Sequence, residues 1–131
     1  MHITLESDYA IRIVQMLAGA NTRMDAKTIA EETCVTLRFS LKILRKLVTE
    51  GLVRSYKGSQ GGYELTRPAN EISLKDVIEA VEGDYKLSRC LSEDYACTRG
   101  RSGNCCVQDA FNQISEIVQE KLATYTFDKL M

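Results

Sequence analysis

The fold is decided by residues 25–51, DAKTIAEETCVTLRFSLKILRKLVTEG. Asp25 can cap a short helix over 26–32 that places Ile29 and Ala30 on its core face. After a tight turn, Thr36 can cap another helix, which ends at Gly51 and carries one apolar stripe: Leu37, Leu41, Leu44, Leu47 and Val48. Two helices joined in this way predict a helix-turn-helix.

The flanking sequence adds a helix before this unit and a hairpin after it. Ser7 or Asp8 can cap a helix that runs to Gly19, with apolar residues at helical spacing: Ala10, Ile13, Val14 and Leu17. Beyond Gly51, segments 52–57 and 63–66 have strand character and flank a polar, glycine-rich tip. We therefore expect a β-hairpin directly after the helix-turn-helix.

Two further helices are predicted, with an irregular segment between them. Ser73 and Asp76 have the spacing of a capping box, and the helix that follows can end at Gly83 and pack back on the preceding unit. Residues 84–104 have no hydrophobic period and are longer than most loops inside compact domains. A long helix then carries a continuous apolar stripe, followed by a tail over 124–131: Val107, Ala110, Phe111, Ile114, Ile117, Val118 and Leu122.

Composition bounds the class of protein. The chain has 131 residues, which is about one domain and excludes a multi-domain enzyme. Its net charge of −1 excludes a uniformly basic nucleic-acid coat and a uniformly acidic chain, and 44% hydrophobic residues are typical of a globular protein. The start resembles no secretory signal and no apolar run is long enough to span a membrane, so we expect a cytoplasmic protein.

The near-neutral total conceals an uneven distribution of charge. Residues 38–67 hold seven basic and two acidic side chains, a net charge of +5, which leaves −6 for the remainder. A local basic cluster of this kind is what phosphate binding through counterion release requires. The alternative is an ordinary solvated helix face, but the basic hairpin that follows favours DNA binding.

The candidate DNA-binding residues lie on the 37–50 helix and on the hairpin. In a helix-turn-helix, the first turns of the second helix enter the major groove. The candidates there are Thr36, Arg38, Phe39, Ser40, Lys42 and Arg45. The hairpin would reach the adjacent backbone or minor groove, where glycines let amides approach phosphates, through Lys57, Ser59, Gln60, Gly61 and Gly62.

Four of the five cysteines lie in the irregular segment. Cys90, Cys97 and Cys105 have the spacing C-x6-C-x7-C, with Cys106 next to the last, which matches neither zinc ribbons nor ferredoxins. Nearby arginines would lower the thiol pKa values and favour thiolates that ligate iron or zinc or react with oxidants: Arg89, Arg99 and Arg101. An inert loop is the alternative.

The remaining metal-ligating residue types carry little weight. Cys34, before the 37–50 helix, is expected to be a small buried residue. His2 is the only histidine, so a histidine-rich zinc site is excluded.

Four segments together resemble the Rrf2 family of bacterial winged-helix transcription regulators, whose IscR and NsrR members carry iron-sulfur clusters. They are residues 8–12 (DYAIR), 51–53 (GLV), 57–65 (KGSQGGYEL) and 72–83 (ISLKDVIEAVEG). The resemblance implies a mainly α homodimer with a small β-hairpin wing. It divides the chain into a winged helix-turn-helix domain (1–83), a cluster-binding loop (84–106), and a dimerisation helix with its tail (107–131).

The resemblance also implies a ligand set. The family's three cluster cysteines correspond to Cys90, Cys97 and Cys105, and a 2Fe-2S cluster is favoured over 4Fe-4S. The fourth ligand stays open, because IscR-like proteins have a histidine where this chain has Gln108. An NsrR-like aspartate donated across the dimer corresponds to Asp8, which has an alternative role as a helix cap, and Cys106 is a third possibility.

Sequence recognition departs from that of IscR at two positions. Leu41 stands where IscR has a glutamate on the reading helix, so the operator preference cannot be transferred. Lys57 replaces the usual wing arginine, which retains the charge and loses the forked geometry that suits guanine or a narrow minor groove.

The leading hypothesis is therefore a homodimeric DNA-binding regulator controlled by an iron-sulfur cluster that senses redox, iron or nitric oxide status. A second hypothesis keeps DNA binding and replaces the cluster with thiol-disulfide or zinc switching. A third, a small electron carrier or metalloenzyme, is weaker because the chain lacks a catalytic base or nucleophile constellation. We expect no enzymatic activity and no small-molecule substrate.

Overall fold

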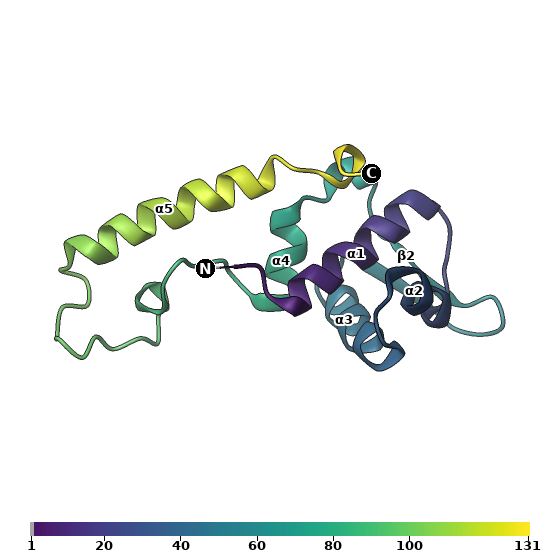
Figure 1. Cartoon of the computed structure of the whole chain (residues 1–131), viewed down its shortest axis with the longest axis horizontal. Coiled ribbons are helices and arrows are strands. Elements are labelled where there is room, and N and C mark those ends of the chain that lie inside the picture. The colour runs from purple at the N-terminus through teal and green to yellow at the C-terminus, as the bar shows by residue number, and fades with distance from the viewer. Residues whose placement is uncertain (1) are drawn as a thin grey trace.

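The computed structural model describes residues 2–131 (Figure 1). The helices and strands, in chain order, are α1 (Leu5–Ala20), α2 (Ala26–Thr33), α3 (Leu37–Thr49), β1 (Val53–Tyr56), β2 (Gly62–Leu65), α4 (Leu74–Glu82) and α5 (Cys106–Ala123), with short 3₁₀ turns at Ala69–Glu71, Arg89–Leu91 and Phe127–Lys129. In Figure 1, α1 to α4 and the hairpin form one packed unit, from which α5 and the 84–105 loop extend to one side.

The caps that start the helices are local, and most follow the sequence. The side chains of Asp25 and Thr36 accept from the amides of Thr28 and Phe39, and Ser73 and Asp76 form the predicted capping box.

The predicted cap of α1 is wrong. The helix begins at Leu5, earlier than expected, because the Ser7 amide donates to the Thr4 hydroxyl at 3.2 Å. Ser7 is buried instead, and Asp8 pairs with Arg12 one turn later at 2.8 Å.

Two features of the helix-turn-helix also differ from expectation. Cys34 is exposed rather than buried, because it is the left-handed C-cap of α2, with φ of 57°, and this residue lies outside the core. Leu37 and Leu41 are 46% and 38% exposed. Steps of four residues advance about 40° beyond a full turn, so these leucines drift away from the buried face of Ile43, Leu44 and Leu47.

The hairpin is antiparallel, with Val53 paired to Leu65 and Tyr56 paired to Gly62. It is tied to the segment before α2 by two hydrogen bonds between Met24 and Tyr63, at 2.8 and 3.0 Å. Gly62 allows this approach, because a Cβ there would lie 2.7 Å from the Met24 carbonyl oxygen. The wing is thereby fixed to the helix-turn-helix.

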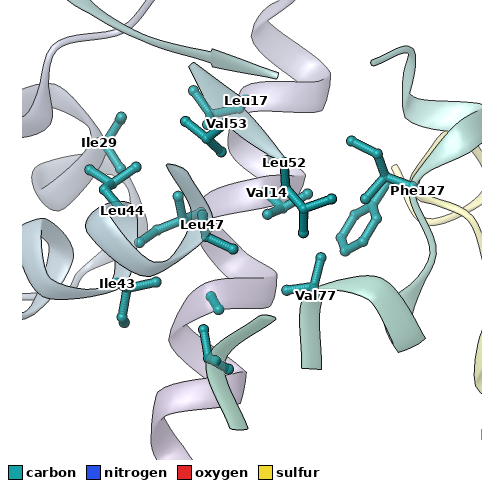
Figure 2. Packing of buried hydrophobic residues seen from close by; sticks show 14 residues of the cluster. Val14, Leu17, Ile29, Ile43, Leu44, Leu47, Leu52, Val53, Val77 and Phe127 are labelled. Atoms are coloured by element: carbon teal, nitrogen blue, oxygen red, sulfur yellow. The ribbon is translucent and has the colours of Figure 1, made fainter. Parts of the chain in front are cut away.

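One hydrophobic core joins these elements, and the C-terminal segment contributes its largest fully buried side chain, Phe127. Figure 2 shows its ring beside Leu52 and Val77. The Leu74 amide donates to the Tyr125 carbonyl at 2.9 Å, and the Phe127 amide donates to Ile72 at 3.0 Å. The segment expected to be a tail is thus packed into the winged unit.

Helix α5 has little cover within the chain. Ser115 is its buried residue, whereas Val107, Ile114 and Ile117 of the apolar stripe are 57%, 43% and 64% exposed. Among residues 2–131, no helix combines the length and the apolar character that a membrane crossing requires.

Candidate DNA-binding face and cysteine pocket

The first turns of α3 present polar and basic side chains to solvent. Thr36, Arg38, Lys42 and Arg45 are exposed, as a groove-reading helix requires. Their positions follow from the burial of Ile43, Leu44 and Leu47 on the opposite side of the helix. Four of the six residues predicted on this helix therefore lie on an accessible face.

The other two predicted residues on α3 support the helix. Ser40 is fully buried, so its side chain is not available to DNA. Phe39 is partly buried and packs edge-on against Tyr9 of α1, with ring centroids 5.6 Å apart. The predicted DNA contact at Ser40 is therefore corrected, because Ser40 lies on the buried face of α3.

The wing tip exposes Lys57, Ser59 and Gln60. Its two adjacent glycines are required by the backbone, since a Cβ at Gly61 would lie 2.5 Å from the Tyr56 carbonyl oxygen. Gly62 is buried against Met24 and is not free to approach a phosphate. The accessible part of the predicted wing surface is therefore its polar tip.

A stacked arginine at the base of the wing was not predicted. The Arg23 guanidinium lies over the Tyr56 ring, 3.3 Å from its centroid, and the Tyr56 hydroxyl donates to the Glu64 carboxylate. Arg54 donates to the same hydroxyl at 3.4 Å, and this contact raises the pKa of the Arg54 guanidinium. Arg23 lies outside the basic segment 38–67, and only the fold brings it to the wing.

The three cysteines of the C-x6-C-x7-C pattern line one pocket of about 170 Å³. Its other lining residues are Tyr95, Arg99, Arg101, Ser102, Val107 and Gln108. In residues 2–131, no three His, Cys, Asp or Glu side chains are close enough together to hold a single metal ion. The fold therefore places the three predicted thiols in one cavity, but they are too far apart to bind a single metal ion in this structure.

The electrostatics of the pocket favour a thiolate at Cys97. The backbone amides of Arg101 and Arg99 donate toward its sulfur, and together with the Arg99 charge they lower the pKa of the Cys97 thiol below its ordinary value. The amides act more strongly than the arginine side chain. A thiolate is the form that ligates metals and reacts with oxidants.

Gln108 braces the pocket. Its side-chain amide donates to the Cys90 carbonyl at 2.7 Å, and its side-chain oxygen accepts from the Gly103 amide at 3.1 Å. The two contacts join both ends of the cysteine segment to the first turn of α5. At the position of the histidine ligand of IscR-like proteins, this chain therefore has a residue that holds the loop.

Neither candidate for a fourth ligand lies in the pocket. Cys106 is exposed at the start of α5, and Asp8 is on α1, paired with Arg12. His2 is exposed and lines a separate pocket, whose loop residues are 84–89 and 92–94 and do not include Cys90. The pocket therefore contains three thiols, and neither of the two other predicted ligands joins them within one chain.

Comparison with known proteins identifies the family. The Rrf2 family, described as an iron-dependent transcriptional regulator, matches residues 3–131. The chain is 30% identical over 135 residues to protein aau3 of Rhizobium meliloti (strain 1021), covering 100% of this chain and 85% of that one.

Two solved structures share the fold. IscR of T. potens has a TM-score of 0.75 at 22% identity, covering 99% of this chain and 85% of that one. CymR of B. subtilis, a global cysteine regulator, has a TM-score of 0.76 at 23% identity, covering 99% and 95%.

Proposed function

Because the chain belongs to the Rrf2 family of DNA-binding transcriptional regulators, a non-enzymatic class, we propose that it is a homodimeric regulator whose operator binding is controlled by an iron-sulfur cluster in the 84–106 loop. The observation that carries this proposal is the pocket lined by Cys90, Cys97 and Cys105. The pocket is formed by this loop and the first turn of α5, and along the chain the loop joins the winged unit, assigned to residues 1–83, to the dimerisation helix with its tail, assigned to 107–131.

The exposed side of α5 supports the homodimer. A groove of about 500 Å³ lies beside it, and its lining is apolar apart from one lysine: Leu74, Ile117, Val118, Lys121, Leu122, Tyr125 and Leu130. A soluble chain that exposes such a continuous apolar surface gains free energy by burying it against a partner. The α5 helix of a second copy, which carries the same stripe, fits this groove.

The exposed face of α3 and the wing tip supply the DNA contacts in this proposal. Arg38, Lys42 and Arg45 would enter or flank the major groove, and Lys57 would reach the neighbouring backbone. A dimer would place two α3 helices on half-sites about 34 Å apart, one turn of B-DNA. A change in their separation by a few ångströms would weaken simultaneous binding.

Cys90, Cys97 and Cys105 would hold the cluster, with Asp8 of the partner or Cys106 as the fourth ligand and 2Fe-2S as the favoured type. A bound cluster supplies one-electron redox chemistry and sensitivity to iron and nitric oxide. The residues of the chain contribute the thiolates, the amides that stabilise charge at Cys97, and the Gln108 brace. The segment after α5 is anchored in the core of the winged unit by Phe127, so a change in the shape of the loop would act on the end of α4 and the start of α5.

The second candidate function keeps DNA binding and places a thiol switch or a zinc ion at the same cysteines. The lowered pKa of the Cys97 thiol favours it, as does the likeness to a cysteine regulator. An electron carrier or metalloenzyme loses its support, because the family consists of transcription regulators.

Anaerobic purification separates these functions. We expect a coloured dimer that contains iron and acid-labile sulfide, with a native mass equal to two chains plus two clusters. Zinc without sulfide, or a metal-free protein whose cysteines form disulfides on oxidation, would reject the cluster in favour of the second function. Native mass of a single chain would reject the homodimer.

A further inference from the structure

Polar contacts join the start of α1, the middle of α3 and the last turn of α4; we call this set the α1–α3–α4 junction. The Lys46 ammonium of α3 lies 2.7 Å from a Glu6 carboxylate oxygen and donates to the Val81 carbonyl at 3.2 Å. Beside it, the Ser7 hydroxyl donates to the Glu82 carboxylate at 2.8 Å. Glu82 is the last residue of α4, immediately before Gly83 and the cysteine loop.

Lys46 compensates two polar groups of the junction. Among residues 2–131, the Glu6 Oε1 atom is inaccessible to solvent and has no hydrogen-bond partner. Its ion-pair partners are Lys46, at 2.7 Å, and Lys42, at 3.8 Å, so the nearer Lys46 charge is its main compensation. The Val81 carbonyl is among the last four of α4, which a helix cannot satisfy internally. A cation at a helix C-terminus is also favoured by the helix dipole.

The contact with α4 distinguishes Lys46 from the DNA-binding residues. Lys42 and Arg45 are exposed on α3, and the Lys42 ammonium also approaches Glu6 Oε1, at 3.8 Å. The Lys46 ammonium lies nearer to that oxygen, at 2.7 Å, and also donates to the Val81 carbonyl of α4. Lys46 was counted in the basic cluster on sequence alone. Its contacts instead give it an internal role, as the polar link from the reading helix to the helix that leads into the loop.

We propose that Lys46 is a positioning residue that couples the start of the cysteine loop to the reading helix. The inference deepens the proposed function by naming the route of regulation and rests on that function for its biological meaning. Val81 and Gly83 are two residues apart, so a loop movement that shifts the end of α4 acts directly on the Val81 carbonyl. Lys46 then transmits the shift to α3 and, through Glu6, to the start of α1.

Coupling of this kind is reciprocal, which permits a test on iron-free protein. The probe is a DNA duplex selected from a randomised library by the wild-type protein. The reporter is amide hydrogen exchange at Gly83, whose N–H donates to the Glu79 carbonyl at 2.8 Å at the end of α4. We expect duplex binding to slow Gly83 exchange several-fold in the wild type, although Gly83 itself is not a predicted DNA contact.

Three variants test whether Lys46 is responsible for the slower exchange at Gly83. Lys46→Met should bind the duplex and lose most of the slowing at Gly83, and Lys46→Arg, which retains the charge and donors, should restore it. Lys75→Met is the matched control and should behave as the wild type, because the ion pair of Lys75 among residues 2–131 lies within α4, with Glu79 at 3.7 Å. Thermal unfolding of each variant establishes that it is folded.

Two results would overturn the inference: no slowing at Gly83 in the wild type, or equal slowing in Lys46→Met. If Lys46→Met does not fold, Ser7→Ala, which removes the neighbouring contact to Glu82, takes its place with the same expectation of reduced slowing. Failure of the proposed function would instead give equal duplex affinity for iron-loaded and iron-free wild type. That outcome is distinct from the result at Gly83.

Discussion

The winged unit and the cysteine loop differ in what holds them. In the unit, side chains from α1, α3, α4, the wing and the C-terminal segment share one core, and several of them have no exposed surface. In the loop, no residue from 84 to 105 is buried, and hydrogen bonds with α5 hold its shape. The Leu87 amide donates to Ser115, and the carbonyls of Cys90 and Tyr85 accept from the side-chain amides of Gln108 and Gln119. A segment held in this way can change shape while the unit stays folded.

The largest contrast is expected between aromatic residues of the two regions. Phe127→Ala removes a fully buried ring from the core and should lower the free energy of unfolding by about 3–5 kcal/mol. Tyr95→Ala in the loop removes a partly exposed ring stacked by Arg89 and should have little effect. Urea denaturation of iron-free protein measures both, and equal destabilisation would break the contrast between the regions.

A smaller effect is expected at the capping box of α4. Ser73→Ala removes the side chain that accepts from the Asp76 amide and should cost about 1 kcal/mol of stability. Ser92→Ala, an exposed loop serine, is the control and should unfold as the wild type does. Thermal unfolding distinguishes the two variants. An unchanged unfolding midpoint for Ser73→Ala would show that the cap does not stabilise the protein.

The loop itself should respond to loss of its anchor on α5. The Leu87 amide donates to the Ser115 hydroxyl at 2.8 Å, a net contribution of about 0.5–1.5 kcal/mol for a typical hydrogen bond. Ser115→Ala should therefore speed Leu87 amide exchange by about two- to tenfold. The Leu44 amide, in the core of the winged unit, should be unaffected, and acceleration at both positions would indicate one cooperative unit.

The smallest effect is a pH dependence at the cap of α2. Hydrogen bonds from the Thr28 hydroxyl and amide lower the pKa of the Asp25 carboxyl below 3.8. The depressed folded-state pKa adds stability that is present above pH 3.8 and is lost as pH falls through the folded value. A carboxyl NMR titration of Asp25 should show the lowered pKa, and Thr28→Ala should return it toward the ordinary value.

The sequence predicts those parts of the fold that depend on neighbours along the chain. The caps at Asp25, Thr36 and Ser73 are visible because each side chain binds an amide three residues on. The tertiary role of Phe127, the stacking of Arg23 on Tyr56 and the junction around Lys46 depend on segments far apart in sequence. No periodicity or spacing reports such contacts.

The residues of the candidate sites also divide into those that the sequence predicted and those that depend on three-dimensional packing. Thiol spacing and the resemblance predicted the three cysteines that share a pocket, and the basic segment predicted the exposed residues of α3. Ser40, Gly62 and Cys34 were misjudged, because burial on a helix face, a close backbone approach and a left-handed cap are set by three-dimensional packing.

The central claim is that the unburied cysteine loop controls DNA binding by the folded unit. Operator affinity of the anaerobically purified iron-loaded dimer, its iron-free form and Cys90→Ala, measured in parallel at one salt concentration, tests this claim most directly. We expect the iron-free form and Cys90→Ala to bind the operator alike and to differ in affinity from the iron-loaded dimer by about fivefold or more. Equal affinity of all three would contradict it.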